Sequence, residues 1–351
     1  MPLLSGVALA KTLRLVIPGL LGPWPERSEP DFPLPQARDL ERLLGWALSR
    51  RMRVAGAEET LFDLFGLSVS PDKDLPVAAV TRLADGGDAE SGWWLRADPV
   101  HLEADRHQVL LRDARNLAVS PREAQTLVRE FNQTFAADGL MLFSWHAARW
   151  YLRLPVDPGL RTVPLMEAAG RDISSALPTG RGARRWRTLL TEVQMLFHAS
   201  EVNQERESRG LPAINGIWFW GGGLLPTAAV SPAEGVYAED LLTRGLVRLA
   251  GAAVSSVPPN VLDWFEAAET EATSLVVLEA TRYDVIDRNP QQWSRQVGQL
   301  ERDWFSPCRA LLKHRELEAL YVYPGNGWRY VVTPRDLLCF WRRRRPLWVY
   351  C

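Results

Sequence analysis

Apolar, β-rich runs alternate with segments of helical periodicity at both ends of this 351-residue chain. Residues 12–17 (TLRLVI) predict a buried strand that ends at Pro18-Gly19, and leucines recur at helical spacing from position 40. A second strand is expected at 75–80. Helices and strands alternate again between residues 239 and 332. This alternation is typical of a mostly parallel sheet covered on both faces, so we predict a three-layer α/β fold.

The later elements follow in a regular order. We expect a helix at 239–249, a strand at 274–279, a helix opened by Asn289-Pro290, strands at 317–323 and 328–332, and a last helix capped by residues 333–336.

The pattern changes between residues 89 and 214. Residues 93–102 and 108–112 predict antiparallel strands, and 139–145 and 149–154 predict two more. Between these pairs, Ser120-Pro121-Arg122-Glu123 supplies an N-cap, a proline at the first helical position and a capping-box glutamate. We therefore expect an α+β insertion, with its connecting helix, over 89–214, inside a core formed by 1–88 and 215–351.

Charge and cysteine content exclude several functional classes. The chain has 41 basic and 42 acidic side chains, so it lacks the broad positive field that nucleic-acid binding requires. Its three cysteines lack metal-ligand spacing and cannot all pair with one another, which favours a reducing cytoplasm and no structural zinc. No apolar run approaches the roughly 18 residues of a membrane span. We expect a cytoplasmic protein with no transmembrane segment and no nucleic-acid partner.

The most informative motif runs from His198 to Pro226 (HASEVNQERESRGLPAINGIWFWGGGLLP). It resembles the segment of archaeal-type cofactor-independent phosphoglycerate mutases, in the alkaline phosphatase superfamily, that closes the inserted domain and returns to the main sheet. The likeness extends back through residues 96–124. It implies a core of alkaline phosphatase type that carries an inserted α+β domain.

A second likeness covers most of the chain. The WFWGGG segment at 218–223 is similar to segments shared by the bacterial regulatory protein family of RpfE type. This likeness implies a regulatory role and no defined chemistry.

The superfamily resemblance implies two divalent metals, held by Asp and His at the carboxyl ends of strands. Here the first strand ends in Pro18-Gly19 where the family has an Asp-rich turn, and the later places read EATRYD at 279–284 and YVYPGN at 321–326. Only His314 follows His198. We therefore expect no metal centre and no cofactor, with an oxygen-only magnesium site at Asp284 and Asp287 as the alternative.

Five polar residues are candidates for ligand binding. Asn203, Arg206 and Asn215 lie in the bridging motif, where amide and guanidinium groups suit either ligand contact or holding a loop between domains. Arg184 and Arg185 belong to an arginine-rich run that suits a phosphorylated ligand or an acidic partner, or forms a solvated linker.

These observations favour a non-catalytic, phosphoglycerate-mutase-like protein with a binding or regulatory role, whose partner is a protein or a phosphorylated small molecule. One alternative is an active metal-dependent mutase or other phosphotransferase with altered ligands. It requires that at least three of five side chains converge: Asp240, Asp263, Asp284, Asp287 and His314. Another alternative is a partner or membrane-surface adaptor that acts through the arginine-rich C-terminus, Arg342–Cys351.

Overall fold

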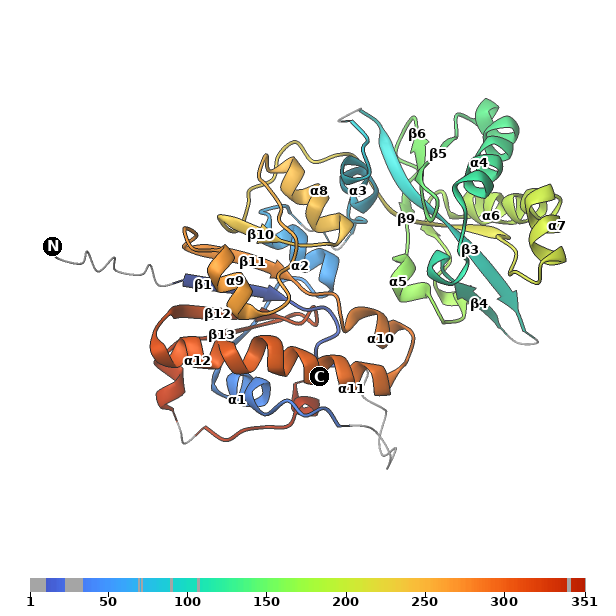
Figure 1. Ribbon diagram of the computed structural model, residues 1–351. Helices are drawn as coiled ribbons and strands as arrows, with labels where there is room; N and C mark the ends of the chain where they lie inside the picture. The colour runs from blue at the N-terminus through green and yellow to red at the C-terminus, as the bar shows by residue number, and fades with distance from the viewer. Residues whose placement is uncertain are drawn as a thin grey trace. The chain divides into compact units, whose positions relative to one another are not determined.

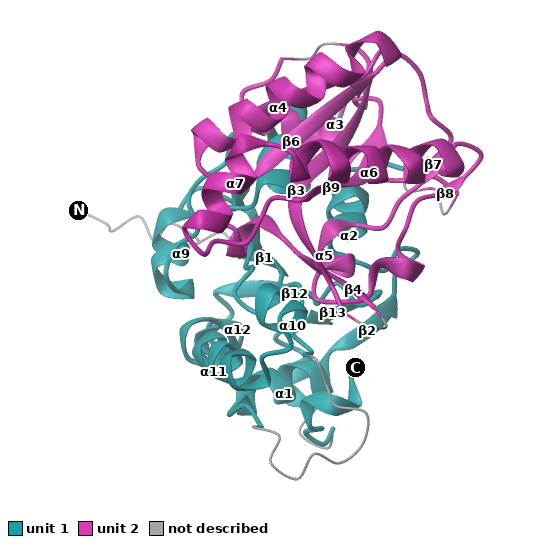
Figure 2. Ribbon diagram, turned by 90° about the vertical axis from the view of Figure 1, so that its right-hand side faces the viewer, with its two compact units in different colours: residues 1–68, 229–351 teal, residues 69–228 magenta. Residues whose placement is uncertain are grey.

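The computed structural model describes residues 11–22, 34–68, 70, 72–88, 91–105, 108–339 and 342–350. The chain forms two compact units, coloured separately in Figure 2. Unit 1 comprises residues 1–68 and 229–351, and unit 2 comprises residues 69–228. His107, Phe340, Trp341 and Cys351, the last of which ends the arginine-rich C-terminus, lie outside the described residues.

Unit 1 contains a six-stranded sheet in the order β10-β11-β1-β12-β13-β2. Its strands are β1 (Lys11–Val16), β2 (Leu48–Arg51), β10 (Gly235–Tyr237), β11 (Thr273–Val277), β12 (Leu317–Tyr323) and β13 (Trp328–Val332). β10, β11, β1 and β12 pair in parallel, whereas β13 and β2 add an antiparallel edge. The predicted α/β class, with a mostly parallel sheet and an inserted α+β unit, is confirmed.

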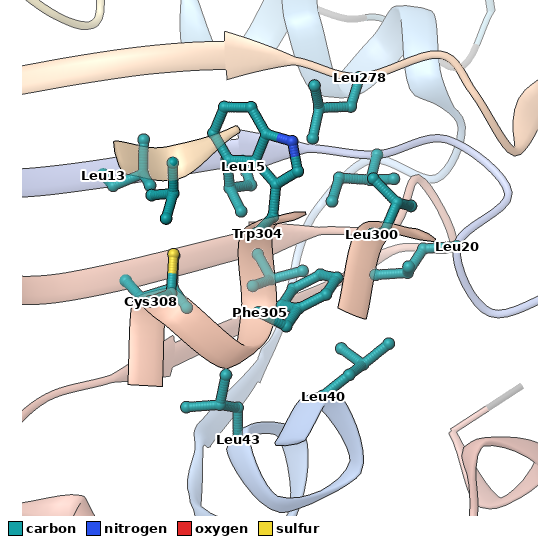
Figure 3. Close-up of a cluster of buried hydrophobic side chains, with 14 of the residues drawn as sticks. Leu13, Leu15, Leu20, Leu40, Leu43, Leu278, Leu300, Trp304, Phe305 and Cys308 are labelled. Atoms are coloured by element: carbon teal, nitrogen blue, oxygen red, sulfur yellow. The ribbon is translucent and has the colours of Figure 1, made fainter. Parts of the chain in front are cut away.

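Helices cover both faces of this sheet (Figure 1). One face carries α1 (Arg38–Trp46), α9 (Val261–Ala267), α11 (Pro290–Leu300) and α12 (Ser306–His314), while α2 (Ala57–Leu64) and α8 (Leu241–Leu249) lie on the other. Alternate residues of β1, Leu13 and Leu15, point into the first face, where they meet Trp304, Phe305 and Cys308 (Figure 3). This alternation explains why a short apolar strand can anchor helices from both ends of the chain.

A wide helical turn, η4 (Glu301–Phe305), joins α11 to α12 as one continuous helical stretch. Pro307 has no N–H to donate to the carbonyl of Asp303, four residues earlier, so the regular helical hydrogen bond cannot form there. The side chain of Glu301 in this turn accepts hydrogen bonds from the backbone N–H groups of Asp39 and Leu40, at 2.6 and 2.9 Å. The turn therefore also caps the start of α1, which has no side-chain cap of its own.

Unit 2 contains an antiparallel sheet in the order β4-β3-β6-β5, with β9 paired to β3. Its main strands are β3 (Trp93–Ala104), β4 (Val109–Arg112), β5 (Met141–His146), β6 (Arg149–Leu154) and β9 (Gly216–Gly223). Its helices are α3 (Val77–Ala84), α4 (Pro121–Phe135), α5 (Leu165–Ala168), α6 (Ala183–His198) and α7 (Glu201–Ser208), and a short ladder joins β7 (Leu160–Arg161) to β8 (Thr179–Gly180). The predicted capping box at Ser120 is present at the start of α4, with both reciprocal hydrogen bonds.

The strand expected at 75–80 is wrong, because residues 77–84 form helix α3. A short apolar run does not distinguish a buried strand from a buried helix, and two consecutive alanines, Ala78 and Ala79, favour the helix. Both alanines pack against Trp94 and Tyr151 of the unit 2 sheet.

The division between the units falls at residues 69 and 228, whereas the sequence placed it at 89 and 214. The difference comes from α3 and β9. α3 packs on the unit 2 sheet, and β9 pairs along β3 through six registered residue pairs, from Val100 with Gly216 to Trp94 with Gly223.

The last helix expected after residues 333–336 is only a three-residue 3-10 turn, η5 (Asp336–Leu338), within the described residues. The Asp336 side chain does accept hydrogen bonds from the N–H and hydroxyl of Thr333, so the capping contact forms without a helix behind it. None of the helices in the described ranges is long and apolar enough to cross a bilayer.

Candidate functional site

The carboxyl ends of the four parallel strands in unit 1 lie along one edge of the sheet, which is where open α/β sheets bind their ligands. β10 is followed by Glu239-Asp240, β11 by residues 278–282, β1 by Ile17-Pro18-Gly19, and β12 by Pro324-Gly325. We describe this edge as the strand-end site, defined by Glu58, Asp240, Glu279 and Arg282.

Arg282, the first residue of α10 (Arg282–Ile286), forms ion pairs with two carboxylates. Its Nη1 donates to Glu279 Oε1 at 2.8 Å, and its Nη2 donates to Oε1 of Glu58, which lies in the first turn of α2. Burial alone would lower the pKa of the Arg282 guanidinium, but the Glu58 and Glu279 carboxylates outweigh it, so that pKa is raised. Arg282 is therefore a permanent positive charge at the strand ends.

The turn after β1 packs against the segment 278–282 that follows β11. Thr281, which is fully buried, donates its hydroxyl to the carbonyl of Pro18 at 2.9 Å. Gly19 has a φ of +79°, and a Cβ there would approach the carbonyl oxygen of Thr281 to 2.9 Å. A side chain at position 19 would therefore be strained in both respects, which explains the glycine at this close turn.

The cost of burying the charged carboxylates of Asp240 and Glu279 is only partly offset by hydrogen bonds and by the charge of Arg282. Burial raises the pKa of Asp240, and the hydrogen bond from the Thr243 N–H and the charge of Arg282 only partly oppose it. Burial also raises the pKa of Glu279; Arg282 opposes this change, whereas the charge of Asp240 adds to it. Asp240 Oδ1 caps α8 by accepting from Thr243 N–H at 2.8 Å, and the Thr243 side chain also hydrogen-bonds this carboxylate.

A hollow of about 320 Å³ lies beside this site. Glu239 and Asp240 border it after β10, Glu279 borders it after β11, and Asp303 and Trp304 border it from η4. It is just large enough for a small molecule, since ligand pockets begin at about 300 Å³.

The donor set at this edge does not fit a two-metal centre. The described residues include Asp240, Asp263, Asp284, Asp287 and His314, yet no group of three or more His, Cys, Asp or Glu among the described residues is placed to hold a metal ion. His314 ends α12 immediately before β12 begins, so it lies at the amino end of that strand, away from the strand-end site. Asp284 lies in α10 and Asp287 directly follows this helix; burial and then the charge of Asp287 raise the pKa of Asp284.

The three candidates of the bridging motif lie in unit 2 and contact backbone. Asn203 donates to the carbonyls of Phe197 and Ile214 and accepts from the Ile214 N–H, while Asn215 exchanges hydrogen bonds with both backbone groups of Leu102. These contacts hold the segment before β9 in place.

Arg206 is 1% exposed and ties three elements of unit 2 together. It donates to Glu123 of α4 at 2.9 Å, to the carbonyl of Pro212 at 2.8 Å and to the carbonyl of Leu117. Burial would raise the pKa of Glu123, but hydrogen bonds from Ser120 and Arg206 outweigh it and lower that pKa. These three contacts are all internal to unit 2.

Arg184 and Arg185 are exposed in the first turn of α6. Arg185 faces Asp138 at 3.8 Å, and Arg184 borders an open hollow of about 700 Å³ together with Arg181 and Arg187. The described residues that line this hollow include no acidic side chain.

Sequence reasoning missed Glu58 altogether, because α2 was not expected. Its signal was local: Gly56 is followed by Glu58 and Glu59 and then by Leu61 and Phe62, which is typical of a helix with an acidic first turn. Arg282 appeared in the sequence analysis only as part of the segment 279–284, and its ion pair with Glu58 is visible only in the structure.

No protein-family model matches the chain. A protein described as a probable 2,3-bisphosphoglycerate-independent phosphoglycerate mutase, from Geobacter sulfurreducens, is 25% identical over 158 residues. The match covers 44% of this chain and only 38% of that protein. It supports a distant relation to cofactor-independent phosphoglycerate mutases.

Two solved structures are similar to this chain. The PH0037 protein from Pyrococcus horikoshii has a TM-score of 0.56 and 12% identity, over 93% of this chain and 88% of its own. A cofactor-independent phosphoglycerate mutase from Thermoplasma acidophilum has a TM-score of 0.44 and 16% identity, over 92% of this chain and 90% of its own. At this identity the likeness to PH0037 shows a shared fold.

A substitution at Arg206 distinguishes a structural role from ligand contact. Arg206→Ala leaves Glu123 and two carbonyls without their donor, so we expect it to lower the free energy of unfolding by about 3–5 kcal/mol in urea denaturation without added ligand. The exposed Arg209→Ala on the same segment is the control, with an expected change within about 0.5 kcal/mol. Equal stability of both variants would contradict the structural role.

The raised pKa of Asp240 predicts a pH-dependent effect of Asp240→Asn. The folded carboxyl holds its proton to higher pH than the unfolded one, whose pKa is 3.8, so the wild type loses stability relative to the variant as pH rises above about 4. The difference grows by about 1.4 kcal/mol for each unit of pKa elevation and then levels off. Asparagine still caps α8, so the cap is not lost.

Urea denaturation of both proteins between pH 4 and 8 measures this difference. Asp63→Asn, at an exposed position of α2, is the control. A stability difference for Asp240→Asn that does not vary with pH would contradict the interpretation.

Proposed function

We propose that this protein is a non-catalytic relative of the phosphoglycerate mutases that acts by binding, in a regulatory role. The observation that carries the proposal is the Arg282 guanidinium, paired with Glu58 and Glu279 at the strand-end site. The regulatory role is proposed from the resemblance to the RpfE-type family. The cytoplasmic location remains a prediction from the sequence.

A guanidinium in this place does not substitute for catalytic metals. Metal-assisted phosphoryl transfer relies on close cations that stabilise the charge spread over the phosphoryl oxygens. The charge of Arg282 is already balanced by two carboxylates, so little of it remains for a transferred group. The neighbouring hydroxyl of Thr281 is buried and donates to Pro18, which removes it as an accessible nucleophile.

The ligand class that fits the exposed arginines is a phosphorylated small molecule. Arg181 and Arg184 have no acidic partner among the described residues, and Arg187 donates only to the carbonyl of Pro178. Three guanidinium groups around one open hollow suit phosphate oxygens, which accept paired N–H donors.

The adaptor alternative has less support, because two arginines of the C-terminal segment, Arg342 and Arg344, already make contacts within unit 1. Arg344 pairs with Glu41 at 3.2 Å, and Arg342 donates to the carbonyl of Trp46 at 2.5 Å. The segment is further held by Leu347, which is 1% exposed in the core.

Metal content and turnover test the proposal together. The purified chain is incubated with manganese, desalted and measured for bound metal, and it is then assayed for mutase activity on 3-phosphoglycerate and for phosphatase activity. We expect far less than one metal ion per chain and no rate above the blank. An active cofactor-independent phosphoglycerate mutase, treated identically, is the control. Stoichiometric manganese with turnover that Asp240→Asn abolishes would overturn the proposal.

A further inference from the structure

β2 is the last strand of the unit 1 sheet, and its outer edge is open. The strand order ends at β2, its four residues are all exposed, and no isolated bridge among the described residues joins it to another segment. A strand in this position presents N–H and C=O groups that have no ladder partner. β2 is therefore a place where an extended chain can add a further strand.

The register with β13 identifies the backbone groups that point outward from β2. The N–H of Met52, just after the strand, donates to the carbonyl of Gly327 at 2.8 Å. Hydrogen-bonded and non-bonded pairs alternate along an antiparallel ladder, so the backbone groups of Arg50 also turn toward β13. Those of Ser49 and Arg51 turn away from β13, and no described residue hydrogen-bonds to them. The open edge thus offers both N–H donors and C=O acceptors.

The side chains along this edge are basic and have no acidic partners. Arg50, Arg51 and Arg53 are exposed, and none of them forms an ion pair with a described residue. Arg50 lies directly opposite Arg329 of β13, and like charges in opposite positions of a ladder repel. Arg329 lies over the ring of Tyr321, with 6.0 Å from the guanidinium carbon to the ring centre, and it also has no ion pair with a described residue. The edge therefore carries positive charge that the described part of the chain does not neutralise.

A second copy of this chain does not suit this edge. If two β2 strands paired with each other, the arginines of both copies would lie side by side, and the repulsion between Arg50 and Arg329 would increase. Charged side chains on an edge strand discourage such pairing in general. A strand that docks here therefore has to bring negative charge.

We propose that β2 is a docking edge for an acidic, extended peptide segment of another protein, which adds a strand beside it. The backbone of such a segment exchanges hydrogen bonds with Ser49 and Arg51. Its carboxylates pair with Arg50 on one face of the sheet and with Arg51 on the other, because successive side chains of a strand point to opposite faces. Leu48 is 53% exposed, and Trp328, opposite Arg51, is 39% exposed, so both offer apolar contacts beside the arginines.

The open backbone groups favour a peptide over other polyanions. An inorganic polyphosphate or an anionic lipid surface accepts hydrogen bonds from arginines, but it has no backbone N–H donors for the outward carbonyls of Ser49 and Arg51. A peptide backbone supplies donors and acceptors at the spacing of the ladder. This proposal goes beyond the proposed function, because it depends neither on the strand-end site nor on the arginines of α6.

Fluorescence anisotropy of the full chain with a labelled acidic peptide, Thr-Val-Glu-Glu-Val-Thr, tests the proposal at pH 7.5 and low ionic strength. We expect saturable binding that weakens as salt is added. The same peptide with a methyl group on every backbone nitrogen keeps its charges but has no N–H donors, and we expect it to bind at least about tenfold more weakly. Equal binding of the two peptides would mean attraction by charge alone and would contradict the proposal.

Substitutions in β2 locate the binding. Ser49→Pro removes an outward N–H that β13 does not use, so it blocks the edge and keeps the ladder, and we expect at least about tenfold weaker binding. Ser49→Ala should bind as the wild type does. Arg50→Gln combined with Arg51→Gln should also weaken binding, whereas Arg184→Gln combined with Arg185→Gln, in unit 2, should leave it unchanged. Circular dichroism of the four variants confirms that they fold.

Amide hydrogen exchange of the wild-type chain measures the docking geometry without any substitution. A bound strand should slow exchange at Ser49 and Arg51, whereas Arg50, whose N–H already faces β13, should change little. Protection at α6 without protection at β2 would place the peptide elsewhere and overturn the proposal. No saturable binding would also overturn it, and would leave protection of the edge against self-association as the role of these arginines. The measurements need neither metal nor 3-phosphoglycerate, so either result stands whether or not the chain is catalytic.

Discussion

The ion pairs of Arg282 determine what the carboxyl edge of the unit 1 sheet can do. A guanidinium fixed between Glu58 and Glu279 joins the start of α2 to the end of β11. It also supplies, from within the chain, a positive charge at the edge where related folds place their ligands. Because the charge is covalently attached and already paired, it stabilises this edge of the sheet. The Pro18-Gly19 turn, packed on Thr281, fills the neighbouring strand end.

Unit 2 depends on a different buried guanidinium. Arg206 donates hydrogen bonds to Glu123 and to the carbonyls of Leu117 and Pro212. Asn203 and Asn215 hold the backbone that leads into β9. In the motif that most resembles the phosphoglycerate mutases, these side chains thus form hydrogen bonds to the backbone and to one capping glutamate. A motif of this kind preserves a scaffold. This explains how a chain can resemble an enzyme family in its architecture while its strand ends differ.

Sequence periodicity predicted most of the elements, because strands such as β1 and helices such as α4 carry local signals: alternation, a capping box, a proline at the first turn. The prediction from periodicity failed where packing between elements determines the local structure. Residues 77–80 form a helix because they fit against Trp94 and Tyr151, and β9 joins β3 rather than the parallel sheet. The pair of Arg282 with Glu58 spans 224 positions of the chain, so no local pattern reports it. The sequence shows Pro18-Gly19 at the end of the first strand, but it does not show the ion pairs that Arg282 makes at the neighbouring strand end.

The identity of the cation at the strand-end site is therefore the central question, and one measurement addresses it directly. Crystals of the full chain grown with manganese, with anomalous diffraction recorded near the manganese absorption edge, show where any metal lies. We expect guanidinium density between Glu58 and Glu279 and no anomalous peak at this edge of the sheet. A strong anomalous peak bound by Asp240 and Glu279, with Arg282 turned away, would contradict the account.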